Sequence, residues 1–267
     1  MSDYPELTQE TLATLRDEFS KKVEELDELP AKVNEAFDRL KWVSITTYYS
    51  WTGVRDDIQS DLSRIISEIK KAVEGMFAPW LFVDYAYKWQ QVGTKVSHAY
   101  GMQNSEELNL EGNWDGSAYK SYKESKNFQA NAMLAIKGLC DGVHEQLLII
   151  AEEGRILYKG IIDKLATIIS EVAVFAAQSA STGGAAVPFV IGDLNAAIVA
   201  GAELIVEAIT NFAETQTKVW TASNELKAMV DHPGAFANAS GTDAWPTPNT
   251  KEYDNKDDDW HLDGEDK

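Results

Sequence analysis

The stretch Asn113-Trp114-Asp115-Gly116-Ser117-Ala118-Tyr119 lies between two long segments with helical patterning. One segment runs up to it from about Val83, and the other leads away from it past Leu165. Glycine tolerates the backbone conformations that a tight reversal needs, and an exposed indole can anchor a neighbouring helix. The stretch therefore predicts the end of a long helical hairpin, with the turn near residues 114–116.

The segment that follows, from Ser117 to about Gln178, carries the longest helical pattern in the chain. Its apolar residues keep a spacing near 3.5, which is typical of helices packed at a shallow angle in bundles and coiled coils. Thr182-Gly183-Gly184 ends this helix, since paired glycines suit a turn, and Pro188 is well placed to begin the next one. A second, apolar hairpin turn is expected near residues 180–188, with the following helix continuing to about Val230.

The N-terminal part is also helical in pattern. Apolar residues recur at three- and four-residue steps over 7–42, where Pro30 is expected to interrupt the helix and restart it. Residues 43–51 resemble a strand in composition, but with no partner strand nearby they are expected to form a helix end and a loop. A second helix is predicted over 54–77, and Pro79 then marks a kink or break.

These patterns together predict an all-α fold. Residues 1–234 are expected to form an elongated antiparallel helical bundle built from long helical hairpins. The hydrophobic fraction of 44% indicates a packed core. Residues 235–267 are rich in acids and contain Pro246 and Pro248, so a disordered acidic C-terminal tail is expected there.

The charge balance excludes some partners. A formal net charge of −19 disfavours nucleic acid, because binding to phosphates requires clustered Lys and Arg. It also disfavours docking on anionic membranes. The single cysteine, Cys140, lies among apolar residues and is expected to be a small buried side chain. The first residues have neither a basic segment nor an apolar core, so no cleavable signal peptide is expected.

The sequence offers no catalytic constellation. The four histidines, His98, His144, His232 and His261, show none of the spacings of a zinc site. Gly-x-Ser-x-Gly elbows, phosphate-binding glycine loops and dinucleotide fingerprints do not occur. We therefore expect a protein that is not an enzyme, with no catalytic residues, no metal and no cofactor.

Residues 165–217 form an apolar hairpin without a single lysine or arginine. Five acids, Glu171, Asp193, Glu203, Glu207 and Glu214, are spread along it, so an ordinary transmembrane helix is not expected. Small residues such as Ala200 and Gly201 favour close helix packing inside a bundle. The alternative is an α-helical pore-forming toxin, in which this hairpin leaves the bundle and inserts into a membrane.

Trp114-Asp115-Gly116, followed by small residues and Tyr119, resembles the WXG superfamily of proteins associated with type VII secretion. Those proteins form helical hairpins with Trp-x-Gly in the connecting turn, and the resemblance extends from about Val83 to about Val230. A second Trp-x-Gly, Trp51-Thr52-Gly53, also falls between predicted helical segments. Its flanks resemble the family less.

The resemblance implies how the protein acts. It suggests a helical protein that leaves the cytoplasm without a cleavable signal peptide, becomes secreted or surface-bound, and works through contacts between helices. Its partner would be another helical WXG-type protein, the secretion machinery or a second copy. Family members or their partners carry Tyr-x-x-x-Asp/Glu as part of a composite export signal. Here the only match is Tyr253 with Asp257, far along the tail, so a partner could supply this half of the signal.

Overall fold

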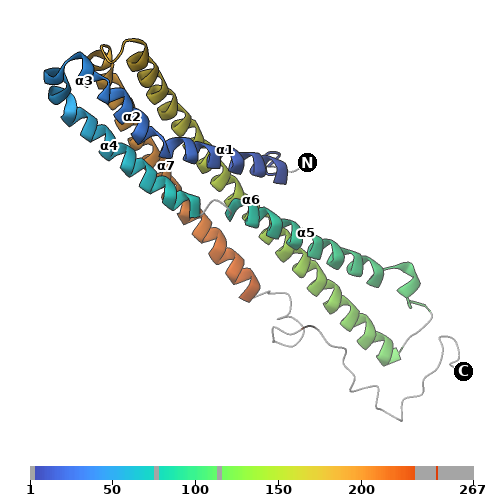
Figure 1. The fold of residues 1–267 in the computed structure, drawn as a ribbon. Helices are drawn as coiled ribbons and strands as arrows, with labels where there is room; N and C mark the ends of the chain where they lie inside the picture. Colours follow the sequence, from blue (N-terminus) through green and yellow to red (C-terminus); the bar gives the residue numbers. More distant parts are fainter. Residues whose placement is uncertain (1–3, 75–77, 113–115, 232–244, 246–267) are drawn as a thin grey trace, which may run out of the picture. The chain divides into compact units, whose positions relative to one another are not determined.

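The computed structural model describes residues 4–74, 78–112, 116–231 and 245, and within these the fold is all-α (Figure 1). The described residues contain no β-strand, which confirms the prediction of an all-α fold. Their helices are α1 (Gln9–Asp27), α2 (Leu29–Asp38), α3 (Leu40–Val43), α4 (Ile45–Glu74), α5 (Ala78–Gln103), a 3-10 turn η1 (Glu106–Leu108), α6 (Gly116–Ser181) and α7 (Val187–Asp231). The predicted acidic tail lies outside the described residues, apart from Trp245.

Contacts within the chain cluster into two compact units. Unit 1 comprises Met1–Val83 and Leu148–Val219, and unit 2 comprises Asp84–Leu147 and the chain from Trp220 onward. Unit 1 thus contains α1 to α4, the later part of α6 and most of α7. Unit 2 contains most of α5 and the earlier part of α6.

Unit 1 begins with a capped amphipathic helix. The hydroxyl of Thr8 accepts a hydrogen bond of 3.1 Å from the backbone N–H of Thr11, which satisfies one of the free donors at the start of α1. Leu12, Phe19 and Leu26 are buried at seven-residue steps along this helix. Pro30 stands in the first turn of α2, so the chain breaks and restarts near this proline, as predicted.

The predicted loop over residues 43–51 is wrong. Only Ser44 is extended there, with φ −159° and ψ 114°, and α4 begins at the next residue. The hydroxyl of Ser44 accepts a hydrogen bond of 3.2 Å from the backbone N–H of Thr47 and so caps α4. Tyr48 is buried with its ring centroid 5.1 Å from that of Phe37. Burial and capping therefore override the strand-like composition.

The second Trp-x-Gly is consequently not a turn between helices. Trp51 and Gly53 lie inside α4, and Trp51 is half-buried against the core of unit 1. Its indole therefore packs within the chain rather than marking a reversal.

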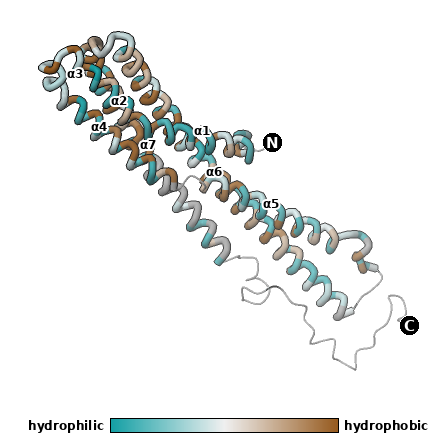
Figure 2. The backbone as a smooth tube through the Cα atoms, viewed as in Figure 1, coloured by the Kyte–Doolittle hydropathy of each residue, from teal (hydrophilic) through white to brown (hydrophobic). Residues whose placement is uncertain are grey.

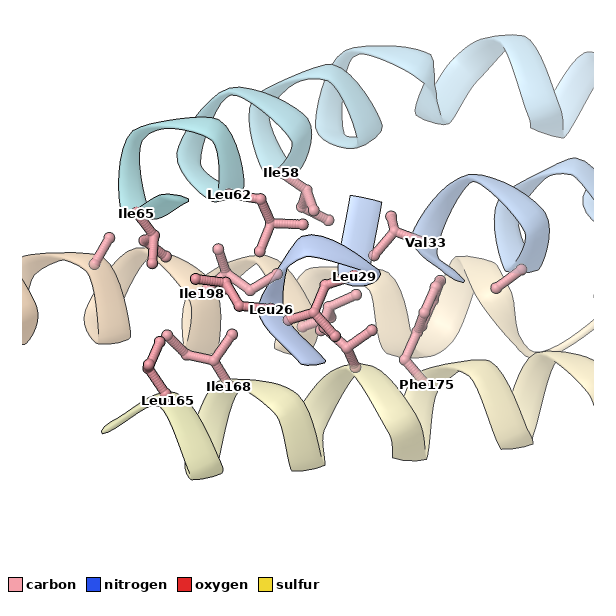
Figure 3. Packing of buried hydrophobic residues seen from close by; sticks show 14 of the residues in the cluster. Leu26, Leu29, Val33, Ile58, Leu62, Ile65, Leu165, Ile168, Phe175 and Ile198 are labelled. Atoms are coloured by element: carbon pink, nitrogen blue, oxygen red, sulfur yellow. The ribbon is translucent and has the colours of Figure 1, made fainter. Parts of the chain in front are cut away.

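The core of unit 1 collects side chains from α1, α2, α3, α4, α6 and α7, and Figure 3 shows part of it. Burying a large apolar side chain contributes roughly 1.5 to 3 kcal/mol, so this cluster dominates the stability of the unit. On α6 the buried positions follow alternating three- and four-residue steps, as in other packed bundles. One such row is Tyr158, Ile161, Leu165, Ile168, Val172, Phe175 and Ser179, and Ile162 is buried beside it.

The turn between α6 and α7 is fastened to the start of the bundle. The hydroxyl of Ser179 donates a hydrogen bond of 2.7 Å to the buried carbonyl of Ala36. Gly183 and Gly184 have φ of +61° and +97°, which favours glycine. A Cβ at Gly184 would lie 2.7 Å from the carbonyl carbon of Arg39 and 2.9 Å from the backbone nitrogen of Leu40. The backbone of this turn therefore lies directly against the α2–α3 junction.

Tyr158 couples α6 to α4 and gives a pH-dependent prediction. Its hydroxyl donates a hydrogen bond of 2.9 Å to the carbonyl of Ala72, and burial raises the pKa of its phenol to about 12. An unfolded tyrosine has a pKa of about 10, so above pH 10 the unfolded chain loses this proton first. The stabilisation is complete below pH 10 and is lost as the pH rises through 12, by about 3 kcal/mol.

Phenylalanine has no ionisable proton, so Tyr158→Phe removes this pH dependence together with the hydrogen bond to Ala72. We expect the variant to be less stable than the wild type at neutral pH, by about 1 kcal/mol for the lost hydrogen bond. Its free energy of unfolding, measured with urea, should then fall less steeply between pH 10 and 12. Parallel pH profiles for the two proteins would contradict this assignment.

Candidate partner-binding hairpin

In unit 2, α5 and α6 pack as antiparallel neighbours. Three cross-helix pairs define the register: Ala86 with His144, Gly93 with Cys140, and Gln103 with Gln129. Along α5 the residue numbers of these pairs rise, while those of the paired residues on α6 fall. The chain therefore reverses direction between Gln103 and Gly116. The sequence predicts a reversal in this region.

Small residues let the two helices approach each other closely. A Cβ at Gly93 would lie 3.1 Å from the Cβ of Cys140, so the helix backbones meet tightly at this point. Cys140 is buried, as predicted, and burial raises the pKa of its thiol. Further towards the open end of the hairpin, Nδ1 of His144 donates a hydrogen bond of 2.9 Å to the carbonyl of Ala86.

Polar contacts hold the connecting segment to the first turns of α6. Lys123 forms an ion pair of 2.9 Å with Glu111, and the hydrogen bond to this carboxylate raises the pKa of the lysine. The same ammonium lies 5.8 Å from the ring centroid of Tyr119. Gly112 has φ +84°, so the connecting segment adopts a left-handed conformation here.

The described part of the Trp-x-Gly motif stands at the start of α6. Gly116 is exposed, is the first residue of this helix and has φ +86°, a conformation that other residues rarely adopt. Tyr119 is half-buried one turn further on. Trp114 and Asp115 lie outside the described residues, as do Tyr253 and Asp257. The structure therefore brings Gly116 and Tyr119 to the predicted turn.

The side chains that the hairpin buries are small. Among the described residues of 84–147, the buried ones are Ala86, Gly93, Ala132, Cys140 and Val143, and no aromatic or long aliphatic side chain is among them. By contrast, every residue of the large core cluster belongs to unit 1. The hairpin thus lacks a core of large side chains within the described part of the chain.

Large apolar side chains of the hairpin instead face solvent. Tyr85 is 50% exposed and Val92 is 44% exposed, and with Ala99 they recur at seven-residue steps along one stripe of α5. This stripe is not among the features predicted from the sequence. Its seven-residue spacing was available as a signal, but spacing alone does not tell a covered face from an open one. Other exposed apolar residues of the hairpin are Tyr87, Met102, Leu108 and Leu134.

The apolar hairpin of α6 and α7 belongs to unit 1. Contrary to expectation, its acids leave one stretch, Val187–Asn211, that is long and apolar enough to cross a membrane, with a mean hydropathy of 1.8. The buried helix of a globular core passes the same test. Here Val187, Ile191, Leu194 and Ile198 are buried in the core of unit 1, and in all 33% of the 18-residue apolar window of this stretch is buried.

The described residues contain no cluster that could hold a metal ion. Within them, no three His, Cys, Asp or Glu side chains come together as metal ligands would. Comparison with protein-family models, with curated proteins and with solved structures finds no match to this chain. The features that bear on function are therefore the Trp-x-Gly motif and the surface of the hairpin.

Proposed function

We propose that this chain is a non-enzymatic, secretion-associated helical protein of the WXG type, and that it acts by binding another helical protein through the α5–α6 hairpin. The observation that carries the proposal is the contrast within unit 2. The hairpin buries only small side chains and exposes Tyr85, Val92 and Met102.

Burial energetics favour a helical partner for this surface. An isolated pair of helices buries one side of each helix, so apolar residues on the flanks stay in water until further helices cover them. Each large apolar side chain that becomes buried contributes roughly 1.5 to 3 kcal/mol. The stripe of Tyr85, Val92 and Ala99 follows the helix axis and has the seven-residue repeat that knobs-into-holes packing requires.

The turn supplies the second element of the proposal. Gly116 begins α6 in a left-handed conformation, and the preceding residues complete the Trp-x-Gly motif. In the proposal, the indole of Trp114 and the hairpin face together form the surface that the partner or the type VII secretion machinery recognises. The chain would then move from the cytoplasm to the cell surface or the medium with this partner.

Adding a charge to the apolar stripe tests the proposal. Val92→Glu is expected to weaken the complex about thirtyfold, because burying a carboxylate without a partner costs about 2 kcal/mol or more. Val92 is half exposed, so the fold should persist. The measurement is the fraction of the chain in a larger complex in extracts of its native host, by size-exclusion chromatography and immunoblotting.

Gln91→Glu is the matched control. It adds the same charge at the neighbouring, exposed polar position, and on a helix that position faces about 100° away from Val92. Gln91→Glu should elute with the complex. Val92→Glu should elute later, as a smaller species. The same chromatography of the purified chain shows whether the partner is a second copy. Equal amounts of complex for both variants would argue against the hairpin face.

The pore-forming toxin is the second candidate, and the apolar stretch Val187–Asn211 favours it. In that function the α6–α7 hairpin would leave the core and enter a bilayer. Such a step exposes the residues that Ile191, Leu194 and Ile198 now cover. Dye release from liposomes by the purified chain would support it, and intact liposomes across a range of pH values would exclude it.

A further inference from the structure

One end of unit 1 gathers exposed apolar side chains from two segments that are far apart in the sequence. The α3–α4 corner exposes Trp42 (90%) and Ile45 (62%), and the first turn of α7 exposes Phe189 (82%). The contact of Gly184 with the backbone of residues 39 and 40 joins these segments. Figure 2 shows hydrophobic residues at this end of unit 1. The corner surface consists of Trp42, Val43, Ile45, Tyr49 and Phe189.

The corner surface is almost free of charge. Residues 40–54 and 172–192 contain one charged side chain, Lys41, although charged residues make up 25% of the chain. Lys41 forms an ion pair of 2.8 Å with Asp38. A surface of this composition can leave water without stripping ions of their hydration.

Most backbone N–H groups at the corner surface donate hydrogen bonds within the chain. In the α6–α7 turn, every N–H from Thr182 to Phe189 donates a hydrogen bond inside the turn, except at Pro188, which has no N–H. At the other segment, the N–H groups of Trp42, Ser44 and Tyr48 donate to backbone carbonyls, and that of Thr47 donates to the Ser44 hydroxyl. In a lipid environment each unpaired backbone group is costly, so internal pairing is a precondition for entry.

From these features we propose that the corner surface docks into the interfacial layer of a zwitterionic lipid bilayer. Trp and Tyr favour the headgroup level, where one end of the ring meets apolar chains and the other meets water, and Phe189 and Ile45 would reach the acyl boundary. A zwitterionic surface is specified because the net charge of −19 repels anionic lipids. The core of unit 1 stays closed in this mode, so docking differs from hairpin insertion.

The inference is independent of the proposed function. It uses only residues of unit 1, and neither the α5–α6 hairpin nor Trp114 takes part. Loss of lipid binding would therefore leave binding of the helical partner unchanged. Loss of partner binding would likewise leave lipid binding unchanged.

Flotation of the full chain with phosphatidylcholine vesicles tests the inference. The wild type is expected to float with the vesicles, and Trp42→Ala and Phe189→Ala should each lower the partition coefficient at least tenfold. Trp220→Ala is the matched control, because it removes another exposed indole, 68% exposed, from a different part of the chain. It should bind as the wild type does. Unchanged thermal unfolding of all three variants is the check on folding.

Three further outcomes would overturn the inference. The first is stronger binding to vesicles that contain phosphatidylserine, which would indicate a basic site. The second is release of an enclosed dye, which would indicate hairpin insertion. The third is a dimer that Trp42→Ala dissociates without any vesicle binding by the wild type, which would show that a second copy covers the surface. One outcome supports the inference: at low salt the chain binds phosphatidylserine vesicles more weakly than phosphatidylcholine vesicles, and added salt removes this difference by screening the charge repulsion.

Discussion

Replacing Gly184 by alanine is expected to lower the free energy of unfolding of unit 1 by at least about 3 kcal/mol. Two causes act together. The φ of +97° is strained for any residue with a Cβ, and the added methyl group would lie 2.7 Å from the carbonyl carbon of Arg39. That neighbour is backbone in the α2–α3 junction, so it cannot rotate away as a flexible side chain would.

Gly183→Ala separates the two causes. Gly183 also has a positive φ, of +61°, but no atom lies within 4 Å of a Cβ built there. This variant should lose only the conformational term, about 1 kcal/mol. Urea unfolding of both variants, followed by circular dichroism, gives the comparison. Similar losses for the two would show that the turn does not lie against the α2–α3 junction.

The long helices could be predicted because their signals are local. Apolar residues at alternating steps of three and four define α6 over many turns, and the glycine pair and Pro188 set the turn that follows. The prediction of Ser117 to about Gln178 thus lies close to the observed Gly116–Ser181.

The α3–α4 corner could not be predicted in the same way. Residues 43–51 are β-branched and aromatic, and what makes them helical is the Ser44 cap together with the packing of Tyr48 on Phe37. The second of these contacts depends on tertiary structure, which local propensity does not contain. The same limit explains why the local pattern places Trp51 between two helices, whereas it lies inside α4.

For the candidate site, the sequence predicts where the hairpin lies, but not which of its side chains are exposed. A glycine after the connecting segment indicates a reversal, and Gly116 has the conformation that such a role requires. Whether Tyr85 and Val92 are covered depends on what packs against α5, and no local pattern encodes that. The exposed fraction of these side chains comes only from the structure.

Trp114→Ala is expected to lower export at least tenfold. An aromatic anchor at the centre of an interface commonly contributes 2 kcal/mol or more to binding, and the substitution precedes Gly116, the first residue of α6. Helicity measured by circular dichroism should therefore equal that of the wild type. The loss would then reflect recognition and not folding.

Trp42→Ala is the control for export. It also removes one indole, but from the corner surface of unit 1, where 90% of the side chain is exposed and the proposed partner does not bind. Each variant should thus lose one property: Trp114→Ala loses export and keeps binding to phosphatidylcholine vesicles, while Trp42→Ala does the opposite.

The decisive measurement for the role of Trp114 is the ratio of secreted to cellular chain in the native host, compared between wild type, Trp114→Ala and Trp42→Ala. We expect a ratio at least tenfold lower for Trp114→Ala and an unchanged ratio for Trp42→Ala. Export of Trp114→Ala at the level of the wild type would contradict this role.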